Sequence, residues 1–400
     1  MFRAALFAVV LAESVWPQAA NSPPDQGLLE KIRTHMADNL RRQPNYTCLE
    51  TIERSRRPVG GELQMRDVLR LEVALIDGKE MFAWPGSKEF QDPRTPGLVT
   101  FGTFGTGNFA ELARSVFSGD GPEFSYVGQS TRGGRMLQRW DFRVSTEHGR
   151  IRLKIYDQET VIGFSGTFYA DPLTLDIIQL EMTAPDVTGE SGDSLVIAID
   201  YVPTRFGQQE FSFPSDSDLH LIALGRDDEN RVQFASCREF AAKSDLRFGD
   251  EVPDAPKAEP SGVREVELPA GTALPLALLD DIELTNAAAG DSVRAELTAD
   301  IKWQGKVLVS KGAIARGRLT RVEHYTERVV VGLMFQDMEW PGGRAPLRLT
   351  FVRARGLPSV RSERNLVLSF GLVPAEGAVM MQPTRKRLNR GILTSWRTEP

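Results

Sequence analysis

The chain has 400 residues, of which 41% are hydrophobic and 26% are charged, and its formal net charge at pH 7 is -6. This length and composition are typical of globular proteins with about two or three domains. The acidic balance disfavours nucleic acid as a partner, because phosphate binding needs a basic face. With four histidines and two cysteines, the chain also offers few ligands for a metal ion. We therefore expect no metal, no cofactor and no nucleic acid.

The first twenty residues have the pattern of an export signal. Arg3 provides a positive charge, Ala4 to Ala12 is an apolar run of about nine residues, and the small residues Ala19 and Ala20 precede a polar segment. The run is too short to cross a bilayer, and no other stretch is long and apolar enough to be a transmembrane helix. We expect cleavage near Ala20 and a periplasmic or secreted protein. The alternative is an apolar N-terminus that frays.

The two cysteines matter if the chain is exported. Cys48 lies near the start of the first domain and Cys237 near its end, and an oxidising compartment would allow a disulfide between them. That bond would close a loop of about 190 residues, for which the chain-entropy model gives an upper figure of about 5 kcal/mol. The alternative is two buried free thiols, because spacing alone does not show whether the sulfur atoms meet.

Helical spacing of apolar residues marks the start of the first domain, which we place at residues 21–247. Gly27 to Arg41 carries leucine, isoleucine and methionine on one stripe and predicts an amphipathic helix. A shorter helix is predicted after the glycine-rich stretch 101–109, with Asn108 as its N-cap and Glu111 at the capping-box position. No Lys-Ser/Thr pair follows the glycines, so the pattern favours a loop over a phosphate cradle.

The rest of the first domain has the pattern of β-strands. Asn45 to Arg57 predicts a strand with Tyr46, Cys48 and Ile52 at buried positions. From residue 122 to 213, successive strand-like segments are joined by short turns. Such an order indicates an antiparallel and strongly curved sheet.

An acidic segment with several prolines, residues 248–265, follows the first domain. Such a segment stays extended and buries little, so we interpret it as a linker. Residues 266–380 then hold about seven short strand-like segments cut by glycine turns, which is typical of a small all-β barrel or sandwich domain. Residues 381–400 contain five Arg and Lys residues and predict a solvated basic tail. The alternative for this tail is contact with anionic lipid or a partner.

The order of elements in the first domain carries a resemblance. A helix over 27–41, strands over 45–84, a helix over 108–117 and a β-meander follow one another, and Gly166 to Met182 has paired strands around an Asp-Pro turn. This order resembles the lipoprotein-carrier and outer-membrane lipoprotein-sorting group of periplasmic proteins, over about half of the chain. The resemblance implies an unclosed antiparallel β-barrel with a helical lid, whose concave face holds acyl chains. The chain departs from that group in its C-terminal domain and its cysteine pair.

Turn residues carry a second resemblance, in the C-terminal domain. The pattern is Pro269-Ala270-Gly271-Thr272, then Gly290-Asp291, then Lys311-Gly312-Ala313, and finally Gly317. It resembles the β-barrel domain of conjugation-channel scaffold proteins and related bacterial envelope proteins, and glycine suits turns and close approaches at these positions. The resemblance implies a structural or docking module without catalytic residues, and not membership of a conjugation machine.

Few residues suggest catalysis. The acids Glu50 with Glu53, and Asp280 with Asp281, are the nearest approach to a catalytic carboxylate pair. Neighbouring residues on a strand point to opposite faces, so Asp280 and Asp281 would not converge as a glycosidase requires. No Gly-x-Ser-x-Gly elbow lies on a strand-to-helix turn, and His220 is expected in a loop. We therefore expect no enzymatic activity.

The favoured hypothesis is an exported, non-enzymatic envelope protein whose first domain offers a concave apolar surface to a lipid-like ligand or a lipidated partner. One alternative is a structural or protein-docking envelope component that takes no small ligand and uses its C-terminal barrel as the contact. Another is a hydrolase, which would need a polar pocket with converging titratable groups. Aromatic side chains are the candidate lining, with plain core packing as their alternative role. The candidates are Phe82, Trp84, Phe104, Phe109, Phe124, Tyr126, Phe164 and Phe168, together with Phe101 and Tyr169.

Overall fold

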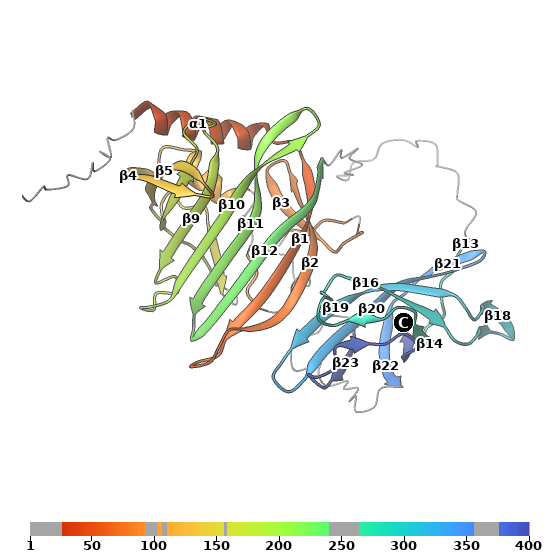
Figure 1. Ribbon diagram of the computed structural model, residues 1–400. Coiled ribbons are helices and arrows are strands. Elements are labelled where there is room, and N and C mark those ends of the chain that lie inside the picture. Colours follow the sequence, from red (N-terminus) through yellow and green to blue (C-terminus); the bar gives the residue numbers. More distant parts are fainter. Residues whose placement is uncertain are drawn as a thin grey trace, which may run out of the picture.

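The computed structural model describes residues 26–87, 89–92, 99, 102–105, 110–155, 158–239, 264–355 and 376–399. This part of the chain is mainly β structure, with two helices and two large sheets (Figure 1). The first sheet has ten strands and the second has nine, and most of the buried apolar residues form one core for each sheet. The predicted fold class, mainly β with a few helices, is confirmed.

The first sheet is antiparallel throughout. Its strands are β1 (Tyr46–Arg57), β2 (Gln64–Ile76), β3 (Lys79–Ala83), β4 (Glu123–Arg132), β5 (Arg135–Val144), β8 (Phe164–Ala170), β9 (Ile177–Pro185), β10 (Ser194–Phe206), β11 (Gln209–Ala223) and β12 (Arg226–Glu239). They follow the order β3-β2-β1-β12-β11-β10-β9-β8-β5-β4. A separate hairpin of β6 (Arg152–Ile155) and β7 (Gln158–Val161) lies between β5 and β8 in sequence.

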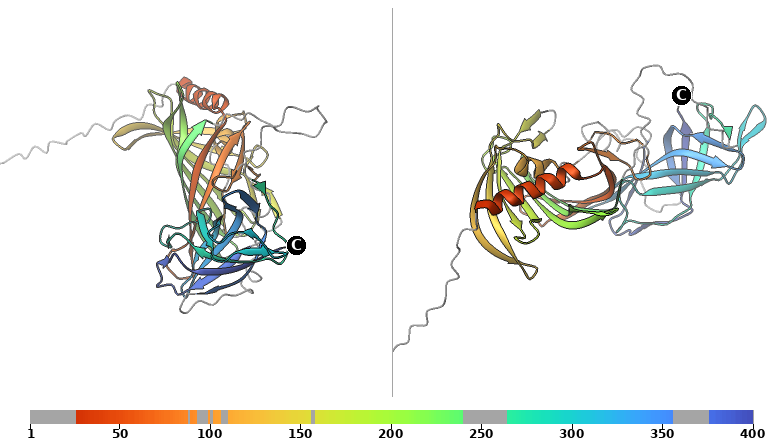
Figure 2. Two further views of the ribbon diagram at one scale, coloured as in Figure 1. Left: turned by 90° about the vertical axis from the view of Figure 1, so that its right-hand side faces the viewer. Right: turned by 90° about the horizontal axis from the view of Figure 1, so that it is seen from above.

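The first sheet curls into an open half-barrel, and α1 (Gln26–Arg42) lies across its open side when the molecule is seen from above (Figure 2). Ile32, Met36 and Leu40 recur every fourth residue along α1 and are 0%, 1% and 4% exposed. This stripe packs into the core of the half-barrel. The Asn39 side chain fixes the helix further, because it exchanges two hydrogen bonds with the backbone of β11. The helical lid implied for the first domain is therefore present.

The second helix, α2 (Glu111–Phe117), begins later than the sequence pattern predicts. Ala110 occupies its N-cap position, and Asn108, the predicted N-cap, lies outside the described residues. The helix gains stability from burial, since Leu112, Val116 and Phe117 are at most 2% exposed.

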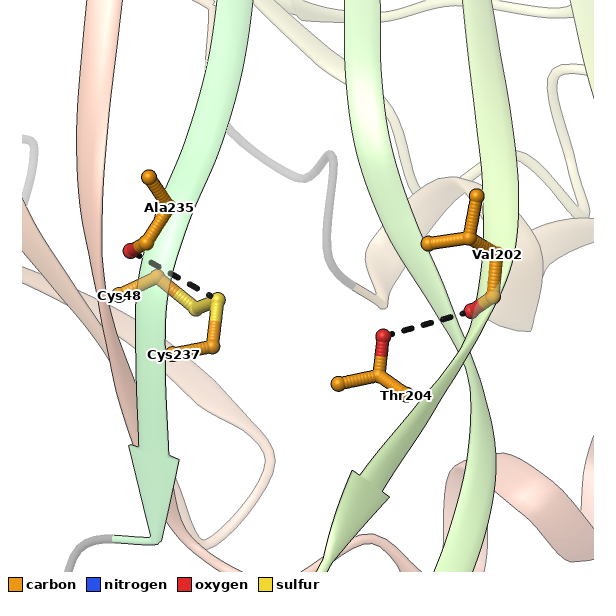
Figure 3. The surroundings of a disulfide bond; sticks show 5 residues. All are labelled: Cys48, Val202, Thr204, Ala235 and Cys237. Atoms are coloured by element: carbon orange, nitrogen blue, oxygen red, sulfur yellow. Dashed lines mark hydrogen bonds between the residues drawn. A yellow bond between two sulfur atoms is a disulfide. The ribbon is translucent and has the colours of Figure 1, made fainter.

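The pairing of β1 with β12 joins the two ends of the first domain. Cys48 and Cys237 form a disulfide across this pair, with 4.1 Å between their Cα atoms (Figure 3). A register shift between Thr47 and Leu49 accompanies it. At the other end of the pair, Arg56 donates two hydrogen bonds to the Asp228 carboxylate, at 2.5 and 3.1 Å. The junction is thus fastened at both ends.

The second sheet belongs to the C-terminal domain. Its strands, with those of two separate two-stranded sheets, are β13 (Arg264–Glu265), β14 (Ala273–Leu278), β15 (Ile282–Glu283), β16 (Ser292–Leu297), β17 (Ile301–Trp303), β18 (Lys306–Val309), β19 (Ile314–His324), β20 (Val329–Trp340), β21 (Gly343–Pro346), β22 (Leu349–Arg355), β23 (Gly377–Met381), β24 (Arg387–Leu388) and β25 (Leu393–Thr398). The large sheet runs β13-β21-β20-β19-β16-β14-β25-β22, with β23 paired to β20. β15 pairs with β24, and β17 pairs with β18.

The solvated tail predicted for residues 381–400 is wrong. β25 lies between β14 and β22 in the large sheet. Thr394 and Trp396 point inward and are 0% and 1% exposed, whereas Arg397 between two buried neighbours is exposed. The alternation of a half-buried strand is therefore present, and Arg397, the one basic residue of β25, lies on its outer face.

Several predictions fall outside the described residues. They are the export signal over 1–20, most of the linker 248–265, the strand-like end of the small domain near residue 370, Phe101 and Phe109. The domain limits 21–247 and 266–380 stay a prediction, although beyond residue 380 β25 joins the second sheet and β24 pairs with β15.

The two domains contact each other along β2. The Arg70 amide donates to the Ala289 carbonyl at 2.7 Å, and the Ala289 amide donates to the Val68 carbonyl at 2.8 Å. The Arg70 side chain also forms an ion pair with Asp291. Gly290 lies so close to β2 that an added Cβ would be 2.2 Å from the Arg70 carbonyl oxygen, and its φ is +104°. Only glycine fits this position without displacing one domain from the other.

Removing the disulfide should destabilise the first domain. For Cys48→Ala combined with Cys237→Ala, we expect the free energy of unfolding to fall by about 3–5 kcal/mol, because the unfolded chain regains the entropy of a long open loop. Urea unfolding of the full chain measures this, and wild type in reducing agent should match the double variant. Equal stability of the oxidised wild type and the double variant would contradict a structural role for the bond.

Substituting Gly290 should separate the domains without unfolding them. Gly290→Ala places a Cβ against the Arg70 carbonyl, so we expect a larger radius of gyration in X-ray scattering. Gly271→Ala is the matched control, because Gly271 also has a positive φ of +78° but nothing within 4 Å of its added Cβ. Identical scattering from the two variants would show that the contact along β2 does not hold the domains together.

Candidate functional site

The concave face of the half-barrel carries the candidate site. Its inward side chains come from alternate positions of the strands and form one apolar cluster with residues of α1 and α2. Seven of the predicted lining residues are part of this cluster or pack against it, and Tyr169 is also in the buried core. The seven are Phe82, Trp84, Phe104, Phe124, Tyr126, Phe164 and Phe168.

The predicted lining residues do not converge on one place. At one end of the sheet, Trp140 lies between Tyr126 and Phe168, with ring centroids 5.4 and 5.3 Å away. Elsewhere Phe82 meets Phe104 edge-on at 5.2 Å. These are contacts of a packed aromatic core. A role in lining a ligand stays a prediction for each of them.

Trp84 lies at the contact with the second domain. The Arg318 guanidinium lies 5.0 Å from the centre of the Trp84 ring, and a Cβ on Gly290 would be 3.2 Å from that ring. Burial at this contact lowers the pKa of Arg318 to about 10. Trp84 therefore helps to hold the domains together, a role that its sequence context did not indicate.

A buried carboxyl interrupts the apolar concave face. Glu50 follows Tyr46 and Cys48 on the inward side of β1, opposite Leu71 of β2 and Phe234 of β12. It is 2% exposed, and its Oε2 atom has no hydrogen-bond partner in the part of the chain that the structure describes. Burial, and then the charge of Glu80, raise the pKa of Glu50 well above its ordinary value. A buried acid that lacks a partner for one of its oxygens is thus set among mainly apolar side chains.

Two buried phenols share this face. Tyr46 and Tyr201 are 0% and 3% exposed, and burial together with the charge of Glu80 raises the pKa of both. The Tyr46 ring packs edge-on against Phe213 with centroids 4.6 Å apart. The hydroxyl of Tyr201 has no hydrogen-bond partner among the described residues. The concave face thus holds several polar atoms without exposing them to water.

The sequence pattern of β1 contains a signal for the burial of Glu50. Tyr46, Cys48 and Ile52 were predicted to be buried, and Glu50 has the same parity along the strand. Glu50 does not form a carboxylate pair with Glu53, because Glu53 points to the opposite face of the strand and is exposed.

A short irregular segment, Gly102–Gly105, covers part of the concave face. The Thr103 hydroxyl donates to Asp228 Oδ2 at 2.8 Å, and the Asn230 side-chain amide donates to the Thr103 carbonyl at 2.9 Å. Phe104 packs on Phe82, as described above, and a Cβ on Gly105 would be 2.8 Å from Leu219 of β11. The segment is therefore held on the inner side of the sheet by side chains and not by a strand ladder.

The carboxylate under this segment is strongly bound. Burial acts to raise the pKa of Asp228, but hydrogen bonds from Arg56 and Thr103 outweigh it and hold the pKa below its ordinary value. Beside it, Arg54 donates two hydrogen bonds to buried Asp67, both at 2.6 Å. These acids are satisfied by their partners, in contrast to Glu50.

One group of side chains has the composition of a metal site. Ligand atoms of His220, Asp227 and Glu229 lie within 4.8 Å of one another. However, Arg57 contacts Asp227 at 3.2 Å and Glu229 at 3.0 Å, and His220 is already 2.8 Å from Asp227. The arginine compensates the acids, so the arrangement fits a surface ion-pair network. His220 lies in β11, so its predicted position in a loop is wrong.

The hydrolase alternative gains no support from the described residues. His148 contacts the Ser145 hydroxyl at 3.0 Å, but both belong to one exposed turn and no carboxylate there orients the imidazole. His35 contacts Asp176 at 3.0 Å, which fastens α1 to the turn before β9. Neither helix in the described ranges has the length and apolar character of a membrane span.

Comparison with known proteins finds no matching family model and no matching curated protein. Among solved structures, the chain is similar to a domain named for outer membrane lipoprotein sorting, from Vibrio parahaemolyticus, with a TM-score of 0.32 and 8% identity over 54% of this chain and 93% of that one. It is also similar to a DUF1329 family protein from Desulfovibrio piger, with a TM-score of 0.32 and 10% identity over 55% of this chain and 95% of that one.

The first of these structures belongs to the group that the first half of the sequence resembles. At this level of overlap, neither structure assigns a ligand or an activity to the chain. The resemblance of the second domain to conjugation-channel scaffold proteins stays a prediction.

Stability should depend on pH through Glu50. Its folded pKa is raised above the unfolded value near 4.5, so the folded state keeps a proton that the unfolded state releases. The stability that protonated Glu50 contributes is fully present below the unfolded pKa. It is lost as the pH rises through the folded pKa. The Glu50→Gln variant has no carboxyl to titrate at this position. At pH 8 we therefore expect its free energy of unfolding to be about 1–3 kcal/mol larger than that of wild type.

Urea unfolding of both proteins at pH 4.5, 6 and 8 measures this difference. It should grow with pH. A difference that stays constant, or that grows toward low pH, would show that Glu50 is not a buried acid with a raised pKa.

Proposed function

We propose that the first domain binds a lipid-like ligand, with its acyl chain along the concave face of the half-barrel. The observation that carries this proposal is Glu50, whose carboxyl is buried on the inward side of β1 with no hydrogen-bond partner for Oε2 among the described residues. An unpaired buried acid destabilises a fold whose interior serves only packing. A ligand with an apolar chain and a polar head would bury its chain among the aromatic rings and give Glu50 a hydrogen-bond partner.

Entry of such a ligand requires the segment Gly102–Gly105 to move. Among the described residues, two side-chain hydrogen bonds and the ring of Phe104 hold it on the inner face, and such contacts break at a lower cost than the ladder of a strand would. The acyl chain then takes the place of Phe104 against Phe82 and excludes water from the face. No bond of the ligand is broken in this process, and the protein acts as a carrier or receptor.

The cellular setting is part of the same proposal. A disulfide between Cys48 and Cys237 is consistent with an oxidising compartment, which we take to be the periplasm or the exterior of the cell. There the ligand would be a free lipid or the acyl group of a lipidated protein. The second domain would act as a fixed contact for an envelope partner.

Mass spectrometry of lipid extracts tests the proposal directly. Full-length protein purified after export should carry an acyl-containing species that a mock purification lacks. The purified protein should also enhance the fluorescence of dansyl-undecanoic acid. Absence of any acyl species and of probe binding, also after incubation with added lipids, would overturn the proposal.

Three variants locate the binding. Thr103→Val removes the hydrogen bond to Asp228 and should tighten probe binding about threefold, because the covering segment leaves more easily. Glu50→Leu should weaken binding about tenfold, because the head loses its partner. Thr204→Val is the control, because among the described residues its hydroxyl donates to the nearby Val202 carbonyl alone, at 3.5 Å on the same strand (Figure 3). Equal affinities for all proteins would place the probe elsewhere.

A further inference from the structure

A small hairpin of the second domain exposes large apolar side chains. β17 and β18 form a two-stranded sheet outside the large one, and β18 lies at the end of the second domain that faces away from the half-barrel (Figure 1). Trp303 and Val307 are each 50% exposed. Few large apolar side chains in the described chain are exposed to this degree, and Trp303 is the largest of them.

The base of the hairpin is buried in the second domain. Ile301 at its start and Val309 at its end are 4% and 0% exposed and belong to the core of the second domain. Gln304 and Gly305 form the two-residue turn, both with positive φ, of +50° and +78°. This turn type is the ordinary closure of a tight hairpin. The exposure of its tip is therefore a property of a fixed element.

Each face of the hairpin tip pairs an apolar side chain with a lysine. Trp303 is opposite Lys306, and Lys302 is opposite Val307, so each pair shares one face. All six residues from Lys302 to Val307 are exposed. Both faces of the tip are therefore amphipathic and open to solvent.

The charge of the tip differs from that of the whole chain. Between Ile301 and Lys311 there are three lysines and no acidic residue, in a chain with a net charge of -6. The nearest acid in sequence is Asp300, whose carboxylate accepts a hydrogen bond from the Lys311 amide at 2.8 Å. A basic, apolar tip on an acidic protein is electrostatically complementary to an anionic surface.

We propose that the β17–β18 hairpin inserts Trp303 and Val307 into the headgroup layer of an anionic lipid bilayer, while Lys302 and Lys306 contact the lipid phosphates. Tryptophan suits this layer because its ring is largely apolar and its N–H finds polar partners there. Lysine side chains next to the ring would reach the phosphates along their apolar stems. Docking by this tip would direct the half-barrel away from the membrane surface.

Vesicle co-sedimentation of the full chain tests this proposal. Wild type should bind vesicles of phosphatidylcholine and phosphatidylglycerol at least tenfold more tightly than vesicles of phosphatidylcholine alone. Trp303→Ser with Val307→Ser, and separately Lys302→Glu with Lys306→Glu, should each reduce binding to the anionic vesicles at least tenfold. Leu173→Ser is the matched control, because Leu173 is 91% exposed in the turn before β9 of the first domain.

The outcomes separate the alternatives. Loss of binding in both tip variants, with the control unchanged, supports insertion of the hairpin. No vesicle binding by wild type would overturn the proposal, as would equal binding by wild type and both tip variants. If the tip variants lost only the capture of a protein partner, the tip would be a protein-docking element and the membrane proposal would fall. Far-ultraviolet circular dichroism confirms that each variant is folded.

Discussion

The pairing of β1 with β12 is the constraint on which the other features of the molecule depend. In the order of the first sheet, it alone links β1–β3 to the remaining strands, and β2 in turn contacts the second domain. The disulfide fastens one end of this pairing and the Arg56–Asp228 contact fastens the other. Loss of the pairing would divide the half-barrel and separate β1–β3, which carry the contact with the second domain, from the other strands. The same pairing fixes the parity that turns Glu50 inward.

The interior of the first domain combines apolar packing with a buried acid. Most inward residues favour dense apolar packing, and they form a continuous cluster with α1 and α2. Glu50 opposes this, because its carboxyl is buried without a hydrogen-bond partner for Oε2 among the described residues. The cover over part of this face is an irregular segment, Gly102–Gly105, held by contacts such as Thr103 with Asp228. The proposal of a ligand-binding surface rests on this combination of a buried polar group with an irregular covering segment.

Much of the fold was predictable because local patterns in the sequence agreed with the tertiary structure. The helical stripe over 27–41 and the strand over 45–57 appear as α1 and β1 almost residue for residue. At the C-terminus the basic charges favour a solvated tail, but the alternation of the buried Thr394 and Trp396 with exposed residues corresponds to a strand. The candidate site was harder to predict from the sequence. The burial of Glu50 follows from its position in the alternation of β1, but its lack of a hydrogen-bond partner depends on the residues of neighbouring strands. The contact of Trp84 with Arg318 joins residues far apart in sequence, which no local pattern shows.

Hydrogen–deuterium exchange of the full chain, with and without a saturating long-chain acyl ligand such as a lysophospholipid, tests the central claim most directly. If the concave face binds the acyl chain, exchange should change in two places at once. Amides of Gly102–Gly105 should become less protected as the segment leaves, and amides of β1 around Glu50 should become more protected as ligand covers them. Unchanged exchange at both places, with ligand shown to be bound, would contradict the account and locate the ligand elsewhere on the protein.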